Sequence, residues 1–408
     1  MIPNITSDTR IGDLDELNKN FRKVLTETAL SRAGTSTFSL MILWITLKLT
    51  GIPVIAGLAD GLYTAPLFLS FFVGTFVDRS RHKKAVAVLS AVSKSLAILL
   101  LYLAIEVNYL YTTVFLIFLC VLALGFTSDI NNAVRSSWTK SFLKEEEYQK
   151  GTSKLNSLES LAQMVGYTLS GAFLYLGDVR GITALILIFV LAIFPILLIK
   201  ERPSKTDQRS EANGFREGLS FLRSSRILQE VIFIGMIVNL ALSMLGIGFT
   251  ILIQTDLKLP AFYFSLAFIS IAVGVIAGSL ISSKARGKLG LIVILSLALI
   301  ALSLFSISFI GIIYIIYVPA FLVGFGVGVV NTPAQTVLLK RIPENMIARS
   351  MGLFNTLALS MTFLSGTIGG LIVQLSSIKV LFIFMGAMMV AGAISVQFLR
   401  ELRGAVIS

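Results

Sequence analysis

The sequence predicts an all-α membrane protein with twelve transmembrane helices in two six-helix, pseudo-symmetric bundles. Three observations support this class. Of the 408 residues, 55% are hydrophobic and only 14% are charged, whereas soluble proteins carry about 25% charged residues. The apolar residues gather in runs of roughly 20, the length that crosses a bilayer as a helix. The two halves of the chain also share residues at a constant offset.

Length and flanking charge place the spans, because a lipid-facing helix is apolar on nearly every side. The twelve expected spans are 27–50, 54–77, 84–104, 109–133, 152–176, 181–200, 228–253, 261–283, 289–310, 312–336, 350–375 and 378–399.

Charge sets the expected orientation. The net charge is +12, and most of the 34 Lys and Arg residues fall in alternate connections between spans. The positive-inside rule then puts both termini in the cytoplasm of a multi-pass cell-membrane protein. The bases therefore act as topology signals, and no nucleic-acid partner is expected. The single cysteine, Cys120, excludes an internal disulfide framework and a Cys-rich metal site, so no metal or cofactor is predicted.

The longest connection divides the spans six and six. The expected organisation is a cytoplasmic N-terminal segment, a first bundle, a linker with an amphipathic helix, a second bundle and a cytoplasmic tail, with bounds 1–26, 27–200, 201–227, 228–399 and 400–408. In the linker, Phe215, Leu219 and Leu222 recur at helical spacing. Such a helix lies either on the inner membrane surface or against the cytoplasmic ends of the spans.

Five residues repeat at an offset of 199. Gly125-Phe126, Asn132, Asn156 and Gly171 correspond to Gly324-Phe325, Asn331, Asn355 and Gly370. Parallel repeats of this kind are typical of transporters, in which a substrate cavity lies on the pseudo-two-fold axis. Three glycine pairs spaced four apart predict close helix contacts: Gly274 with Gly278, Gly324 with Gly328, and Gly366 with Gly370.

A basic turn follows the second span and reads Gly74-Thr-Phe-Val-Asp78-Arg79-Ser-Arg-His82-Lys-Lys84, with a fainter copy at Gly278–Lys288. This turn and the six-plus-six plan resemble the major facilitator superfamily over the whole chain. Two segments resemble one branch of this superfamily, the drug- and macrolide-efflux proteins, which are drug:proton antiporters. They are the second span, with Ala56-Gly-Leu and Pro66, and the linker segment that begins at Phe215. Two features depart from that branch. His82 stands where arginine is usual, and Gly166–Gly171 lacks a proline.

The resemblance implies that the turn is a conformational latch. Asp78 would meet the start of the eleventh helix, near Ser350, where a carboxylate is favoured by the helix dipole. Asp129 would be a further acidic partner of the basic cluster. The latch residues are then Gly74, Asp78, Arg79, Arg81, His82, Lys83 and Asp129. The alternative is a plain positive-inside anchor, and His82 is either a pH-sensitive element or a solvated base.

Charges inside spans indicate function, because a bilayer makes them costly. All fall in the first half: Arg32, Asp60, Lys94, Asp129 and Glu159. Asp60 and Lys94 lie at similar depth, so they form either a proton-coupling site or a structural pair. Arg32, Asp129 and Glu159 form a second network, or Arg32 binds an anionic substrate. The polar candidates for a substrate pocket, or alternatively for hydrogen bonds between helices, are Gln163, Asn239, Asn331 and Gln335.

The function expected from these features is secondary active export of amphipathic or drug-like organic compounds by alternating access, in exchange for protons. The partners are a small organic substrate, protons and the lipid bilayer, and the protein is expected to be a monomer. No phosphate-binding loop motif or catalytic His motif occurs, which argues against an ATP-driven pump and an enzyme. The alternatives are a facilitator or importer of a small metabolite, a lysophospholipid flippase, and a non-transporting receptor or scaffold.

Overall fold

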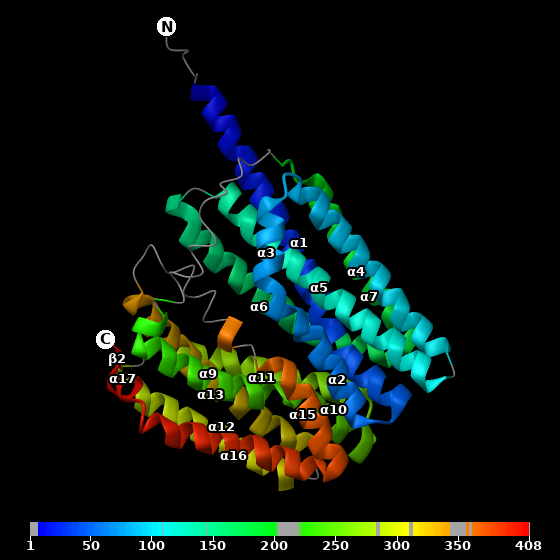
Figure 1. The fold of residues 1–408 in the computed structure, drawn as a ribbon, viewed down its shortest axis with the longest axis vertical. Coiled ribbons are helices and arrows are strands. Elements are labelled where there is room, and N and C mark those ends of the chain that lie inside the picture. The colour runs from blue at the N-terminus through cyan, green and yellow to red at the C-terminus, as the bar shows by residue number, and fades with distance from the viewer. Residues whose placement is uncertain are drawn as a thin grey trace. The chain divides into compact units, whose positions relative to one another are not determined.

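The computed structural model consists almost entirely of helices (Figure 1). It describes residues 7–107, 109–143, 145–201, 220, 222–282, 286–309, 313–342, 356–358 and 361–407. The side chains of residues 7–16 and of some other positions, Asp78 among them, are outside this description.

The first half of the chain contains seven α-helices and a short 3-10 helix in its described residues. Their bounds are α1 Ser7–Thr50, α2 Pro53–Thr64, η1 Ala65–Leu69, α3 Ser70–Arg79, α4 Lys83–Glu106, α5 Leu110–Phe142, α6 Glu145–Tyr175 and α7 Asp178–Leu198. Pro66 lies in η1, where the second predicted span changes from α2 to α3. Because proline cannot donate a backbone hydrogen bond, it favours a break in the helix at this point.

The second half adds a π-helical turn and a two-stranded pair. Its elements are α9 Arg226–Ser243, α10 Leu245–Ile251, η2 Leu252–Asp256, α11 Ala261–Ser282, β1 Gly287–Lys288, α12 Leu289–Phe309, α13 Ile313–Arg341, α15 Thr362–Leu375, α16 Ile378–Val396, α17 Arg400–Gly404 and β2 Val406–Ile407. Within the described chain, each of the twelve predicted spans has a helical counterpart.

Nine helical segments of the described chain are long and apolar enough to cross a membrane, and Pro53–Leu69 is a shorter apolar segment. The two remaining predicted spans are α1 and α6. Both contain many Ser, Thr and charged residues, which lowers their mean hydropathy. These two helices also supply most of the charged network described below.

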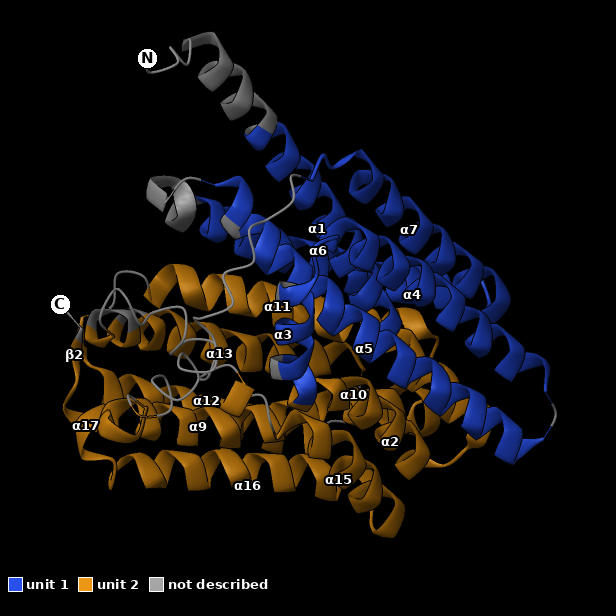
Figure 2. Ribbon diagram, turned by 45° about the horizontal axis from the view of Figure 1, so that its top comes forward, with its two compact units in different colours: residues 1–39, 69–208 blue, residues 40–68, 209–408 orange. Residues whose placement is uncertain are grey.

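The chain packs as two compact units (Figure 2). Unit 1 comprises residues 1–39 and 69–208, and unit 2 comprises residues 40–68 and 209–408. Helix α1 therefore contributes to both, and α2 belongs to unit 2. Residues 202–219 and 221 lie outside the described chain. The division of the chain within the 201–227 linker and the amphipathic helix of that linker therefore stay predictions.

Glycines bring helix backbones into direct contact inside unit 2. A Cβ atom added to Gly57 of α2 would lie 1.9 Å from the carbonyl oxygen of Gly366 in α15, and one added to Gly370 would lie 2.6 Å from that of Pro53. The same holds for α11 and α13, where added Cβ atoms on Gly274 and Gly324 would come within 2.1 Å and 1.9 Å of backbone oxygens. The close helix contacts predicted from the glycine spacing are confirmed, because only glycine permits this approach.

The C-terminal residues pack onto unit 2. Leu402 is buried in α17, and its backbone N–H donates to the Glu230 carboxylate of α9 at 2.7 Å. Strand β2 then pairs antiparallel with β1, Gly287 opposite Ile407 and Lys288 opposite Val406. The segment 400–408, expected only as a tail, is therefore structured over its described residues.

Candidate functional site

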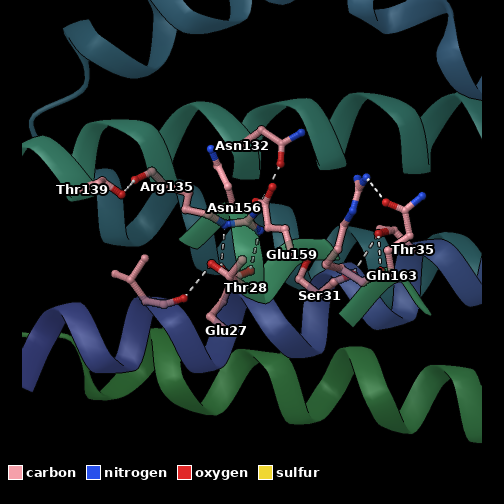
Figure 3. A network of polar contacts seen from close by, with 12 residues as sticks. Glu27, Thr28, Ser31, Thr35, Asn132, Arg135, Thr139, Asn156, Glu159 and Gln163 are labelled. Carbon is pink, nitrogen blue, oxygen red and sulfur yellow. Dashed lines mark hydrogen bonds and ion pairs between the residues drawn. The ribbon is translucent and has the colours of Figure 1, made fainter. Parts of the chain in front are cut away.

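A buried charge network occupies the interior of unit 1, where α1, α5 and α6 contribute the polar side chains labelled in Figure 3. Its centre is Arg135 of α5, whose side chain is 7% exposed. The guanidinium contacts two carboxylates, Glu27 of α1 at 3.3 Å and Glu159 of α6 at 2.8 Å. It also donates to the Asn132 side-chain oxygen at 3.3 Å. A charge inside a low-dielectric region needs such partners, and here three helices are tied together by one guanidinium.

Access to solvent differs between the two carboxylates. The Glu27 side chain is 5% exposed, whereas that of Glu159 is 30% exposed. Glu159 is therefore the more exposed acid of the network.

Lys94 of α4 is the second buried cation, with 2% exposure. Its ammonium donates to the Ser31 hydroxyl at 3.4 Å and lies 5.4 Å from the centre of the Phe189 ring. Ser31 is one helical turn, about 5.4 Å, from Glu27 on α1, so Lys94 lies close to the Glu27–Arg135 pair. Within the described part of the chain no carboxylate lies within ion-pair distance of Lys94.

Arg32, next to Ser31 on α1, faces α6. Its terminal nitrogen donates to the Gln163 side-chain oxygen at 2.9 Å, and the Gln163 amide in turn donates to the Tyr167 hydroxyl. The Nε atom of Arg32 is buried and has no hydrogen-bond partner in the described residues. Arg32, Glu159 and Gln163, three of the sequence-predicted site residues, thus lie in one network with Lys94.

Two members of this network, Glu27 and Arg135, were not predicted from the sequence. Glu27 stands at the first residue of the expected first span, and Arg135 follows the expected end of the fourth. The helices extend further, so both residues are well inside α1 and α5. A signal was present on α6, where Asn156, Glu159 and Gln163 are spaced three and four apart and so share one helix face.

Asp60 lies on α2 in unit 2 and is half-buried. One carboxylate oxygen would be 3.1 Å from a Cβ atom added to Gly366, so the acid packs on α15 beside the glycine contact. The predicted pairing of Asp60 with Lys94 joins residues of the two separate units and stays a prediction.

The predicted latch residues follow α3 and begin α4. Arg79, Arg81 and His82 are exposed. Lys83 is buried and donates to the Ser137 hydroxyl of α5. Gly74 has open space where a side chain would extend. The side chain of Asp78 and the expected helix start near Ser350 lie outside the described residues, so the latch itself remains a prediction.

Asp129 does not pair with the basic cluster, contrary to the expectation. Its carboxylate accepts a hydrogen bond from the Ser70 hydroxyl at 2.8 Å, and its second oxygen is buried without a partner in the described chain. The reason is the position along α5. Ser137, which Lys83 reaches, is eight residues or about 12 Å further along the helix.

Of the other pocket candidates, all on unit 2, Asn239 of α9 donates to the Ala358 carbonyl oxygen at 3.1 Å and so joins two segments. Asn331 and Gln335 lie exposed on α13. Of the five charged residues predicted inside spans, Asp60 lies in unit 2, and Arg32, Lys94, Asp129 and Glu159 lie in unit 1.

The family model of the Major Facilitator Superfamily matches residues 28–366. The chain belongs to the major facilitator superfamily. It is 23% identical over 361 residues to the uncharacterized MFS-type transporter YkuC of Bacillus subtilis strain 168, covering 82% of this chain and 81% of that protein.

Solved structures of superfamily transporters share the fold. The nucleoside transporter NupG superposes with a TM-score of 0.72 at 12% identity, covering 94% of this chain and 99% of that one. A POT family transporter in complex with a thioalcohol-conjugated peptide gives a TM-score of 0.71 at 15% identity, covering 93% and 96%. At these identities the likeness establishes the fold alone.

Membership of the major facilitator superfamily makes the chain a multi-pass membrane transporter rather than an enzyme. It also confirms the all-α fold class predicted from the apolar runs and the internal repeat. The family does not define the substrate, the direction of transport or the coupling ion.

Proposed function

We propose that this superfamily transporter exports amphipathic or drug-like organic compounds in exchange for protons, by alternating access. The observation that supports it is the charge network of unit 1. Glu27, Glu159, Arg135 and Lys94 lie inside a bundle whose helices cross the membrane, where each charge costs several kcal/mol unless it has a function or a partner.

Proton coupling follows from the composition of this network. A proton arriving at the solvent-accessible Glu159 removes one of the two negative charges that hold Arg135. Among the described residues the guanidinium then retains Glu27 as its ionic partner, and the ion pair between α5 and α6 is lost. A binding event is thereby linked to helix packing, which is the physical requirement for coupled transport.

The interior of unit 1 supports an amphipathic substrate. Its charged side chains, Arg32 among them, suit the polar group of such a compound, and the apolar spans of the same unit suit its apolar body. The proposal includes a cell-membrane location, cytoplasmic termini, a monomeric protein, and a latch at Gly74–Lys83.

The test is a reconstitution in proteoliposomes with an imposed pH gradient. The probes are carboxyfluorescein, rhodamine 6G and a neutral coumarin dye, with pyranine in the lumen to report proton flux. Wild-type protein is expected to move at least one dye faster with the gradient and to release protons in the opposite direction. Glu159→Gln removes that acceleration, whereas Glu106→Gln, an exposed acid at the end of α4, preserves it. Dye movement that ignores the gradient in the wild type would contradict proton coupling.

A further inference from the structure

The buried cations of unit 1 outnumber the carboxylates that face them. Arg135 has two acidic partners, but Lys94 and Arg32 have none within ion-pair distance in the described residues. Lys94 contacts a hydroxyl and an aromatic ring, and Arg32 contacts a neutral amide. With Glu27 and Glu159 as the two acids, the network carries one surplus positive charge. An uncompensated charge in such a place is unfavourable, and an anionic ligand that reaches these bases would compensate it.

The geometry indicates where this anion binds. Ser31 and Arg32 are consecutive on α1, so the ammonium held by Ser31 and the guanidinium of Arg32 come from adjacent positions. Gln163 fixes the terminal nitrogen of Arg32, and its own amide is held by Tyr167. The Nε atom of the guanidinium is buried and has no hydrogen-bond partner among the described residues. Arg32 as a whole is only half-buried, so a ligand can reach the exposed part of its side chain, whereas Lys94 is enclosed and supports the site from its interior side.

The chemistry of arginine selects the ligand group. A guanidinium presents parallel N–H donors that match the two oxygens of a carboxylate or sulfonate. We propose that Arg32, supported by Lys94, binds the acid group of the transported substrate, so that the substrate class is amphipathic organic acids. This inference rests on the proposed transport function and makes its substrate class more specific.

The test measures binding by thermal unfolding of the purified protein in detergent, with matched sets of ligands. Each set has one scaffold, naphthalene or biphenyl, carrying a carboxylate, a carboxamide or an aminomethyl group. A ligand that binds the folded state raises the unfolding temperature. The acids are expected to raise it, while the amides and amines do not. Sodium sulfate is included, because an equal effect of sulfate would identify a simple anion site and would contradict a substrate site.

Variants locate the effect. Arg32→Gln is expected to weaken acid binding roughly 10- to 100-fold, the value of a charge-assisted hydrogen-bonded contact. Gln163→Glu keeps the arginine but supplies it with an internal carboxylate, and is expected to abolish acid binding as well. Arg180→Gln removes an exposed base of α7 and serves as the matched control. If Arg32→Gln is poorly folded, Gln163→Glu decides the question by itself.

The outcomes separate this inference from the transport proposal. Equal or absent stabilisation by acid, amide and amine on both scaffolds would overturn the acid site, and so would acid binding that survives in both variants. Gradient-driven export of rhodamine 6G without any acid binding refutes only the acid site. The opposite result is that acids bind in a way that depends on Arg32, while the pH gradient changes the movement of neither dyes nor acids. That result refutes only proton-coupled transport.

Discussion

Replacing Gly57 with alanine tests the backbone contact between α2 and α15. The added Cβ atom would lie 1.9 Å from the Gly366 carbonyl oxygen, and real Cβ contacts are essentially never under 3.0 Å. The two helices must therefore separate by about 1 Å, and neither neighbour is a flexible side chain that can move aside. Gly366 leaves no room on the other side, because a Cβ atom there would be 2.5 Å from the Gly57 oxygen.

The expected cost is about 1–3 kcal/mol, the usual penalty of overpacking. It is offset in part by the helix propensity that alanine gains over glycine, about 1 kcal/mol. Gly74→Ala is the matched control, since nothing lies within 4 Å of its added Cβ atom and only the propensity gain remains. The unfolding temperature in detergent should thus fall for Gly57→Ala and stay level or rise for Gly74→Ala.

Gly57→Ala is then measured in the reconstituted dye assay beside Gly404→Ala, a second site with nothing within 4 Å of the added Cβ atom and outside the proposed latch. Gly57→Ala is expected to slow transport, because α2 and α15 no longer reach their close contact, while Gly404→Ala is less affected. If Gly57→Ala unfolds at or above the wild-type temperature, α2 and α15 are not in backbone contact and this reasoning is refuted.

Three further predictions concern the charged groups. Glu27→Gln leaves Arg135 with one ionic partner and should lower the free energy of unfolding by about 3–5 kcal/mol, as for a broken buried pair; Glu106→Gln, measured by the same chemical denaturation, should change it little. Asp60→Asn should abolish gradient-driven dye movement while substrate exchange continues, and undiminished gradient-driven movement would remove Asp60 from the mechanism. Glu230→Gln weakens the hydrogen bond to the Leu402 N–H by about 1–2 kcal/mol and should make the C-terminal residues more sensitive to carboxypeptidase, whereas an unchanged digestion rate would mean that this contact does not hold α17.

The spans were predictable because hydropathy and length decide them. Helix α4, Lys83–Glu106, and α11, Ala261–Ser282, end within about two residues of the expected spans 84–104 and 261–283. The prediction was poorest where a helix continues beyond the apolar run. Helix α5 extends to Phe142.

Helix α5 continues beyond its apolar run because its last turns pack against α1, and a hydropathy profile does not detect such packing. Val134, Trp138 and Phe142 are spaced four apart and all bury in a cluster that also contains Phe21 and Val24 of α1. The cluster is thus assembled from distant segments, and it stabilises helix beyond the region expected to contact lipid. Charges that a span count assigns to a loop, such as Arg135, are carried into the interior by this extension.

The sequence predicted several individual residues of the candidate site, but it did not predict which residues form ion pairs and hydrogen bonds with one another. Arg32, Lys94 and Glu159 were found because a charge in an apolar run is conspicuous. Their partners depend on which helix faces which, and this is set by contacts far apart in sequence. Asp129 shows the limit, since its hydrogen bond to Ser70 depends on the height of two helices relative to each other.

The paired glycines of α11 and α13 also restrict motion. Gly274 and Gly278 fit against the backbone of α13, and Gly324 and Gly328 fit against that of α11. If one helix slid along the other, a larger side chain would move into a position that now holds a glycine and has no room for a Cβ atom. Sliding of α11 along α13 is therefore sterically opposed. We therefore expect α11 and α13 to move together as a rigid body. Bending of α13 is expected at Pro319 and Pro333, where the helix lacks a backbone hydrogen-bond donor.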